Sequence, residues 1–208
     1  MSYKTEQEAF WHGEFGDEYL KRNNSEQLVV NRMVHFGQFL KGAPRVRSIM
    51  ELGCNVGMNL QALKRLNPAF ELAAYEISPK AADIARELKI ADITTGTVVE
   101  PIDTGRKYDL TFTSGVLIHI NPEVLEGVYE NLYNLSNRYI LINEYYNPTP
   151  VSLAYRGVNE RIFKRDFAGE LMDKYGLQLV DYGFLYRRDN YFPRDDSNWF
   201  LLEKSANK

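Results

Sequence analysis

Short apolar runs alternate along most of this chain with segments whose apolar residues recur at helical spacing. A short apolar run bounded by turn residues predicts a buried strand, and apolar residues three or four apart predict a helix. The predicted strands are residues 46–52, 71–77, 93–99, 108–113 and 138–143. The predicted helices between them are residues 59–66, 79–89 and 122–135. This alternation is typical of a parallel sheet covered by helices on both faces.

Two of these helices carry start signals in the sequence. Ser78 precedes Pro79, and Asn121 precedes Pro122 and Glu123. Ser and Asn side chains cap helices, proline fits the first helical position, and an acid in the first turn complements the helix dipole. We therefore expect helices to begin at Pro79 and Pro122.

The pattern changes in the last third of the chain. Residues 147–163 show no regular pattern and are interpreted as irregular, and residues 166–175 predict one more helix. Residues 177–186 and 198–203 then predict two strands with no helix between them, which favours an antiparallel pair at the end of the sheet. No linker or repeat divides the sequence, so we expect a single domain over 1–208, with residues 1–40 as an N-terminal helical cap.

Composition narrows the class of protein and of partner. The chain has 208 residues, of which 44% are hydrophobic and 25% charged, values that exclude a disordered or low-complexity protein. Lys and Arg number 25 against 28 Asp and Glu, so the net charge of −3 disfavours nucleic-acid binding and favours a small-molecule partner. The single cysteine, Cys54, excludes an internal disulfide. With neither an apolar signal segment nor an apolar run long enough for a membrane, a cytoplasmic protein is expected.

The segment with the most chemical information is ELGCNVGMN, residues 51–59, between the first predicted strand and helix. Glycines at such a turn let the backbone approach a ligand closely. Gly53 and Gly57 are four residues apart, which fits neither the dinucleotide fingerprint nor the phosphate-binding loop. Glu51 lies two residues before the first glycine, where a carboxylate binds an ammonium group and would repel a pyrophosphate.

A second acid, Glu76, ends the second predicted strand, 23 residues after Gly53 (76 − 53 = 23). A carboxylate at this place accepts hydrogen bonds from the ribose hydroxyls of an adenosine. The two acids together predict an adenosine that carries a cationic amino-acid end in place of phosphates. S-adenosylmethionine fits this description, whereas a tight turn that only packs a helix on a strand is the structural alternative.

The motif ELGCNVGMN followed by AAYEIS resembles the first two motifs of class I S-adenosylmethionine-dependent methyltransferases. In the family pattern E/D-x-G-x-G-x-G, Asn55 stands here in the place of the middle glycine, and asparagine tolerates left-handed backbone. The resemblance implies a Rossmann-like, mostly parallel seven-stranded sheet with an antiparallel C-terminal strand pair. It also implies cofactor contacts from the loop. These are Glu51, Gly53, Asn55, Gly57 and Asn59, with Glu76 on the ribose.

A narrower resemblance covers nearly the whole chain. FWHGEFGDEYLKRN, SGVLIHINPEVL, NEYYNPTPVSLAYRG, FKRDFAGELMDKYG and WFLLEK are similar to segments of the pseudaminic-acid-biosynthesis-associated methylases. This clade is named for the nonulosonic-sugar pathways in which its members occur. The resemblance therefore implies a sugar or sugar nucleotide as methyl acceptor.

Further cofactor contacts are expected where other strands end, because ligands of open α/β sheets lie beyond the carboxyl ends of the strands. Ile77 and the segment after the third strand suit the two faces of adenine, and the end of the fourth strand is expected near the reacting methyl group. The residues concerned are Ile77, Thr97, Val98, Val99, Ser114 and Gly115. Ordinary strand-end packing is the alternative for the valines.

The N-terminal segment offers an aromatic and cationic group of residues at helical spacing. A lid over the cofactor is the functional interpretation, with Arg22 paired to the methionine carboxylate. A helix that only packs or faces solvent is the alternative. The candidate cofactor contacts here are Trp11, Tyr19 and Arg22.

Candidates for the chemistry follow the fourth and fifth strands. His119 could accept a proton from a substrate hydroxyl or orient it, and a structural histidine is the alternative. Glu144 and Tyr146 are the other catalytic candidates. An anionic substrate would account for arginines and tyrosines beyond them, although exposed arginines are common on any surface. These substrate-binding candidates are Tyr145, Arg156, Arg165 and Tyr186.

The sequence therefore predicts an enzyme that moves a methyl group from S-adenosylmethionine to a small polar, anionic metabolite, with oxygen favoured over nitrogen as acceptor atom. Catalysis needs in-line positioning at about 3 Å and, for a hydroxyl, a general base. No metal is required, and neither nucleic acid nor a membrane is an expected partner. The alternative is a non-catalytic protein that binds S-adenosylmethionine or S-adenosylhomocysteine.

Overall fold

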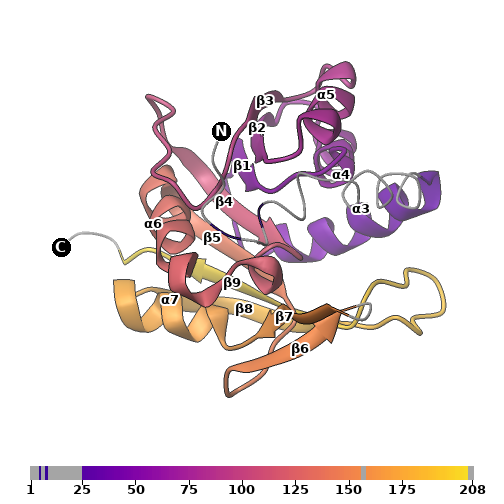
Figure 1. Cartoon of the computed structure of the whole chain (residues 1–208). Helices are drawn as coiled ribbons and strands as arrows, with labels where there is room; N and C mark the ends of the chain where they lie inside the picture. The colour runs from indigo at the N-terminus through magenta and orange to yellow at the C-terminus, as the bar shows by residue number, and fades with distance from the viewer. Residues whose placement is uncertain (1–4, 6–7, 9–24, 156–157, 206–208) are drawn as a thin grey trace.

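The computed structural model of the chain describes Thr5, Glu8 and residues 25–155 and 158–205. Within these residues, a seven-stranded sheet has the strand order β3-β2-β1-β4-β5-β9-β8 (Figure 1). Neighbours from β3 to β5 are parallel, and β9 is antiparallel to both β5 and β8, as the sequence predicts. The strands are β1 Ser48–Leu52, β2 Glu71–Glu76, β3 Asp92–Thr95, β4 Tyr108–Ser114, β5 Ser136–Glu144, β8 Gln178–Leu185 and β9 Ser197–Glu203.

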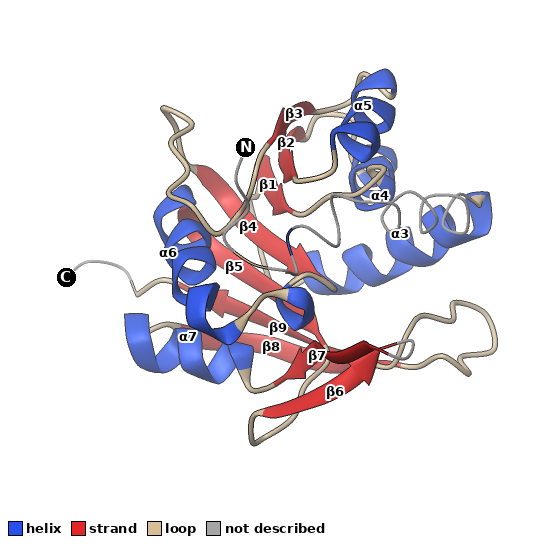
Figure 2. Ribbon diagram, in the orientation of Figure 1, coloured by secondary structure: helices blue, strands red, loops and turns tan. Residues whose placement is uncertain are grey.

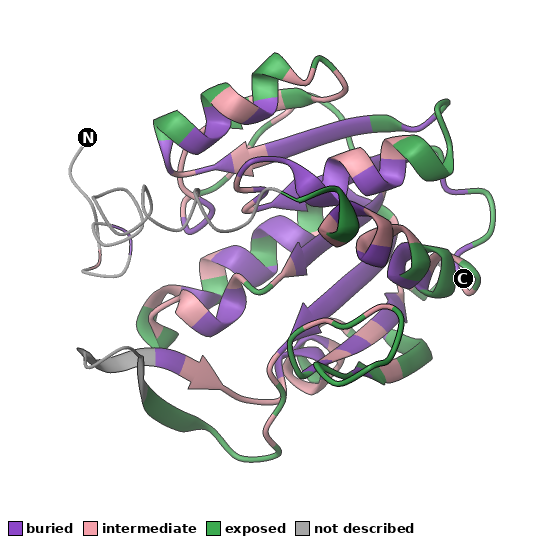
Figure 3. Ribbon diagram, turned by 90° about the vertical axis from the view of Figure 1, so that its right-hand side faces the viewer, coloured by how far each residue is buried: buried purple, intermediate pink, exposed green. Residues whose placement is uncertain are grey.

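Helices cover both faces of this sheet (Figure 2). Alternate side chains of a strand point to opposite faces, and the buried β5 shows both cores. Tyr139 and Leu141 pack with one group of helices, whereas Ile140 and Ile142 pack with the other. The first group is α3 Glu26–Leu40, α4 Met58–Leu66 and α5 Pro79–Glu87, and the second is α6 Leu125–Leu135 and α7 Phe167–Tyr175. The central strands are buried, as Figure 3 shows.

Helix α3 lies within the predicted N-terminal cap of residues 1–40 and packs on one face of the sheet. The Ser25 hydroxyl caps it by accepting from the Leu28 amide at 3.3 Å. Phe36 and Phe39 are buried, and the Phe39 ring lies 4.9 Å from that of Trp199 on β9. No helix in the described part of the chain has the length and apolar character needed to span a membrane.

The predicted helix starts agree with the structure in part. The Ser78 hydroxyl accepts from Ala81, and α5 begins at Pro79. Asn121 caps a short 3-10 turn, η2 Pro122–Val124, and α6 begins only at Leu125. The third strand is shorter than the predicted 93–99, because β3 ends at Thr95.

The interpretation of residues 147–163 as irregular is wrong. They contain most of a hairpin, β6 Val151–Tyr155 and β7 Val158–Lys164, which forms a separate two-stranded sheet. The apolar Val151 and Leu153 alternate with Ser152, but both apolar side chains are exposed. The apolar residues of β6 therefore do not mark a buried face, although Ile162 on β7 is buried in the core.

Candidate functional site

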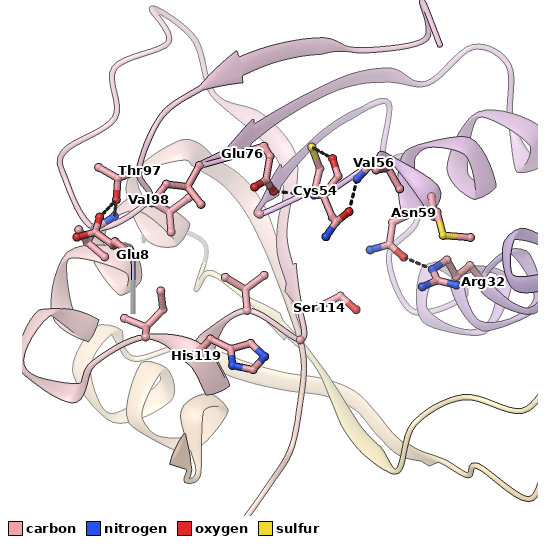
Figure 4. Close-up of a pocket in the computed structure, with 18 of the residues that line it drawn as sticks. Glu8, Arg32, Cys54, Val56, Asn59, Glu76, Thr97, Val98, Ser114 and His119 are labelled. Carbon is pink, nitrogen blue, oxygen red and sulfur yellow. Dashed lines mark hydrogen bonds between the residues drawn. The ribbon is translucent and has the colours of Figure 1, made fainter. Parts of the chain in front are cut away.

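A cavity opens at the carboxyl edge of the parallel strands. Its lining comes from the turns that follow β1, β2, β3 and β4, from helix α3, and from the connection between β8 and β9 (Figure 4). Thr5 and Glu8 add to it from the N-terminal segment. The predicted cofactor contacts that line it are Gly53, Asn55, Asn59, Glu76, Ile77, Thr97, Val98, Val99, Ser114 and Gly115.

The loop after β1 has the left-handed backbone that its glycines and asparagine allow. Gly53 has φ +83°, and a Cβ there would lie 2.6 Å from the Val116 side chain. Asn55 has φ +49°, and its side-chain oxygen accepts from the Val56 amide at 2.7 Å. Asn55 therefore adopts left-handed backbone at the place where the family pattern has its middle glycine. Gly57 also has positive φ but does not line the cavity.

Glu76 joins this loop to the end of β2. Its carboxylate accepts from the amides of Asn55 at 2.7 Å and Ser78 at 2.8 Å. Burial raises the pKa of Glu76, and bonds from the backbone amides of Ser78, Asn55 and Ile77 act against this rise. Each carboxylate oxygen has a second lone pair. Glu76 lines the cavity, and the lone pairs that the amides leave unused can accept hydrogen bonds there.

A row of three polar residues runs from the protein interior to the other end of the cavity. The Asn59 side chain donates to Glu51 at 2.6 Å and accepts from Arg32 Nε at 3.1 Å. Asn59 and Arg32 line the cavity, whereas Glu51 is fully buried and does not. Burial raises the pKa of Glu51 to about 8. Its second oxygen, Oε2, has no hydrogen-bond partner among the described residues.

The segment after β3 forms an apolar wall of the cavity, with one polar residue, Thr97, at its edge. Val98 and Val99 are buried, and Ile77 lines the cavity with them. The Thr97 hydroxyl donates to the Glu8 carboxylate, and the two side chains point toward each other in Figure 4. No motif pointed to Glu8, because its place at this wall depends on a contact across 89 residues of sequence.

The end of β4 leads into a short turn that carries His119 into the cavity lining. This turn, η1 Leu117–His119, follows Ser114 and Gly115. Beneath it, the Glu144 carboxylate accepts from the backbone amides of Val116 at 2.9 Å and Leu117 at 3.2 Å. Burial raises the pKa of Glu144 to about 7. Glu144 does not line the cavity; it fixes the backbone from which His119 projects.

Two arginines in the lining were not among the sequence candidates. Arg32 comes from α3, and Arg194 comes from the connection between β8 and β9. Arg194 Nη2 donates to the Ser114 hydroxyl at 2.7 Å. Neither arginine lies in a motif, and each reaches the cavity only through the packing of distant elements.

The other acceptor-side candidates lie outside the cavity. The Tyr145 ring is 5.2 Å from the Lys164 ammonium, and Arg165 pairs with Glu170 at 2.6 Å. Tyr146 and Tyr186 are exposed. A catalytic role for Tyr146, and a role for Tyr145, Arg165 and Tyr186 in binding an acceptor, stay predictions. Trp11, Tyr19, Arg22 and Arg156 lie outside the described residues.

A family model matches part of this chain. Residues 50–138 match the family model described as Methyltransferase domain, a range that includes the glycine loop, Glu76 and His119. A search of curated protein sequences gave no match.

Solved structures share the fold. Magnesium protoporphyrin IX methyltransferase from Synechocystis PCC 6803, with bound S-adenosylhomocysteine, is 15% identical with a TM-score of 0.70, over 95% of this chain and 98% of that one. Mitomycin 7-O-methyltransferase is 15% identical with a TM-score of 0.69, over 97% and 61%. An S-adenosylmethionine-dependent methyltransferase from Clostridium acetobutylicum ATCC 824 is 12% identical with a TM-score of 0.63, over 93% and 98%.

Proposed function

We propose that this chain, whose fold and methyltransferase-domain match indicate an S-adenosylmethionine-dependent methyltransferase, methylates an oxygen of a small anionic metabolite. The predicted cofactor is consistent with the structures of this fold that hold S-adenosylmethionine or S-adenosylhomocysteine. The finer parts of the proposal are the acceptor and the roles of single residues.

The observation that carries the proposal is the order of groups along the cavity. Glu76 and the apolar wall at Val98 suit an adenosine, and Asn59 with Arg32 suits an amino-acid end. Ser114 and His119 line the same cavity at the end of β4. A cofactor bound in this order would have its sulfonium between the first two groups and His119.

The chemistry needs little from the protein beyond position. The acceptor oxygen forms a bond to the methyl carbon while the carbon–sulfur bond breaks, and S-adenosylhomocysteine leaves with the electron pair. Alignment of the two reactants at about 3 Å supplies most of the catalysis. In our proposal His119 takes the proton of the acceptor hydroxyl as a neutral imidazole, and Glu144 is a positioning residue that holds the His119 turn.

Residues 1–40 are proposed to cap the cofactor. Three residues of this segment support the idea, because Thr5, Glu8 and Arg32 line the cavity. Glu8 bonds Thr97 in the wall proposed for adenine, and Arg32 bonds Asn59 in the region proposed for the amino-acid end. The cap would therefore contact both ends of the cofactor.

Two further observations support an oxygen as the acceptor atom and an anionic metabolite as the acceptor. One protein of similar fold is named as a 7-O-methyltransferase, and two arginines line the cavity here. A nonulosonic sugar or sugar nucleotide is the proposed acceptor class, on the basis of the whole-chain sequence resemblance.

Incubation with methyl-labelled S-adenosylmethionine and a panel of sugar acids, sugar nucleotides and amino acids tests the function. We expect label in a sugar acid or sugar nucleotide and none in the amino acids. His119→Ala serves as the control for chemistry at this site. Label in none of the compounds, with the cofactor bound, would favour the non-catalytic binding protein instead.

A further inference from the structure

We propose that Arg194 forms an anion-binding subsite that holds a carboxylate or phosphate of the methyl acceptor. This inference rests on the proposed function and extends it to a residue that neither the sequence motifs nor the matched family range includes. The matched range ends at residue 138, well before the connection that carries Arg194.

The first observation is the place of the guanidinium. Arg194 Nη2 donates to the Ser114 hydroxyl at 2.7 Å, and this hydroxyl also accepts from the Asn143 side chain at 3.0 Å. Ser114 is the last residue of β4, and His119 follows it in the same cavity lining. Arg194 therefore lies beside the residues proposed to face the acceptor, and its charge also acts on the buried Glu51.

The second observation is that the segment around Arg194 is firmly held. We name residues 186–196, which connect β8 to β9, the arginine arm. At its base, the Arg187 amide donates to Asp196 at 2.9 Å. At its tip, the Asn31 side chain of α3 donates to the carbonyl of Pro193 at 2.9 Å. The arm is thus fixed on both sides of the residue that reaches the cavity.

His35 adds a further bond from α3 to the same arm. Its Nε2 donates to the carbonyl of Phe192 at 3.1 Å, and its side chain is buried. Burial and the nearby Arg194 lower the pKa of His35 to about 4, so the ring stays neutral at physiological pH. A guanidinium supported in this way loses little conformational entropy when it binds an anion.

The third observation is the distribution of charge along the cavity. Glu8 and Thr97 lie at one side of the close-up, and Arg32 with Asn59 at the other (Figure 4). The cofactor has one carboxylate, and Arg32 is the better placed partner for it, because it bonds the Asn59 that contacts Glu51. The proposal assigns the second arginine of the lining, which bonds Ser114, to an anion of the acceptor.

The chemistry of the guanidinium defines the class of ligand. Its planar set of donors binds carboxylates and phosphates through paired hydrogen bonds. Two sources could supply such an anion in this cavity, the cofactor's own carboxylate and the acceptor. Our proposal commits to the acceptor, and the experiment separates the two.

The test uses the whole chain as wild type, Arg194→Gln, Arg194→Lys and the control Arg188→Gln. Arg188 lies on the same arm but is exposed and does not line the cavity. Calorimetry first measures the affinity for S-adenosylhomocysteine, and inorganic phosphate is then titrated into each saturated protein. We expect Arg194→Gln to bind phosphate about tenfold more weakly or worse, as for a lost hydrogen bond to a charged group. Its affinity for S-adenosylhomocysteine should stay unchanged, as should both affinities of Arg188→Gln.

Three results would overturn the subsite. One is phosphate binding by Arg194→Gln that equals wild type, and another is no phosphate binding by wild type. The third is weaker S-adenosylhomocysteine binding by Arg194→Gln with unchanged affinity for 5′-methylthioadenosine, which lacks the carboxylate, because Arg194 would then bind the cofactor. If Arg194→Gln fails to fold, the phosphate affinity of Arg194→Lys is compared with that of wild type. This variant keeps the positive charge but loses the planar set of donors. Failure of wild type to bind S-adenosylhomocysteine would instead contradict the proposed function, and phosphate titrated into the free protein would still report on Arg194.

Discussion

The two ends of the cavity are built in different ways. At the end proposed for adenosine, the groups come from successive strand ends, and Glu76 bonds an amide only 21 residues away in sequence. At the end proposed for the acceptor, Arg194 bonds Ser114 across 80 residues, and its arm is held by α3 across 162 residues. Most groups at the first end are encoded locally, by one strand-turn-helix unit after another. Glu8 is the exception, because it reaches Thr97 across 89 residues. The second end exists only once distant parts of the chain have packed together.

This difference suggests separate functions for the two parts of the cavity. The family match covers residues 50–138, so it includes Glu76, Asn59 and Val98 but leaves out Arg32, the arginine arm and the β6–β7 hairpin. Folds of this kind keep a common site and vary the loops around it. We therefore expect changes at the first end to affect cofactor affinity and changes at the second to affect transfer.

The largest effect is expected at His119. If it is the general base, His119→Ala should lower turnover with the acceptor found by label transfer by about 10²–10⁴-fold. The affinity for S-adenosylhomocysteine should remain within about twofold, since no cofactor group depends on the imidazole in our proposal. Initial rates and calorimetry on the same preparation provide both values. A loss of turnover below about tenfold would show that catalysis needs positioning but no general base. A loss of cofactor affinity as large as the loss of turnover would contradict the difference between the two parts of the cavity.

The next effect is expected at Glu76. If its two oxygens bind the ribose hydroxyls, Glu76→Ala should lose about 1.5–3 kcal/mol of binding free energy, or about 10–150-fold in affinity for S-adenosylhomocysteine. Glu71→Ala is the matched control, because Glu71 lies exposed at the opposite end of the same strand. Glu76→Gln is a second variant, because its remaining side-chain oxygen can still accept from the Asn55 amide and so preserve the loop after β1. Unchanged affinity in a folded Glu76→Ala protein would show that Glu76 does not bind the ribose.

A smaller, pH-dependent effect is expected at Glu51. Its pKa is raised to about 8, so the free protein holds a proton there at pH 7. A cofactor ammonium near the carboxyl favours the ionised form, so binding of S-adenosylhomocysteine should release up to about one proton. Its affinity should then rise by at most about tenfold per pH unit up to about pH 8. Calorimetry in buffers of different ionisation enthalpy measures the release.

The same carboxyl links pH to the stability of the free protein. The folded state keeps the proton up to about pH 8, whereas the unfolded chain loses it near the ordinary value of 4.5. The contribution of this group to stability is therefore complete below pH 4.5 and is lost as pH rises to about 8. Glu51→Gln should show neither the proton release nor this part of the pH dependence. Equal proton release by Glu51→Gln would assign the proton to another group.

What the sequence predicted follows the same division. The sheet, most of its helices and the loop at Gly53 follow from apolar periodicity, capping residues and glycine spacing, which are local properties. Arg32 and Arg194 could not be found this way, because many arginines occur in the chain and only tertiary packing selects these two. For Glu144, the sequence predicted a place at the end of a buried strand but did not predict its burial beneath the His119 turn. The hairpin was missed because its short alternating pattern has exposed apolar side chains.

The central claim is that the cavity at the carboxyl edge of the sheet binds an adenosine with an amino-acid end. Calorimetric titration of the whole chain with S-adenosylhomocysteine, NAD and ATP tests it most directly. Our account predicts one S-adenosylhomocysteine per chain and much weaker binding of NAD and ATP, because the spacing of Gly53 and Gly57 fits neither the dinucleotide fingerprint nor the phosphate-binding loop. Binding of NAD as tight as that of S-adenosylhomocysteine, or no binding of S-adenosylhomocysteine, would contradict it.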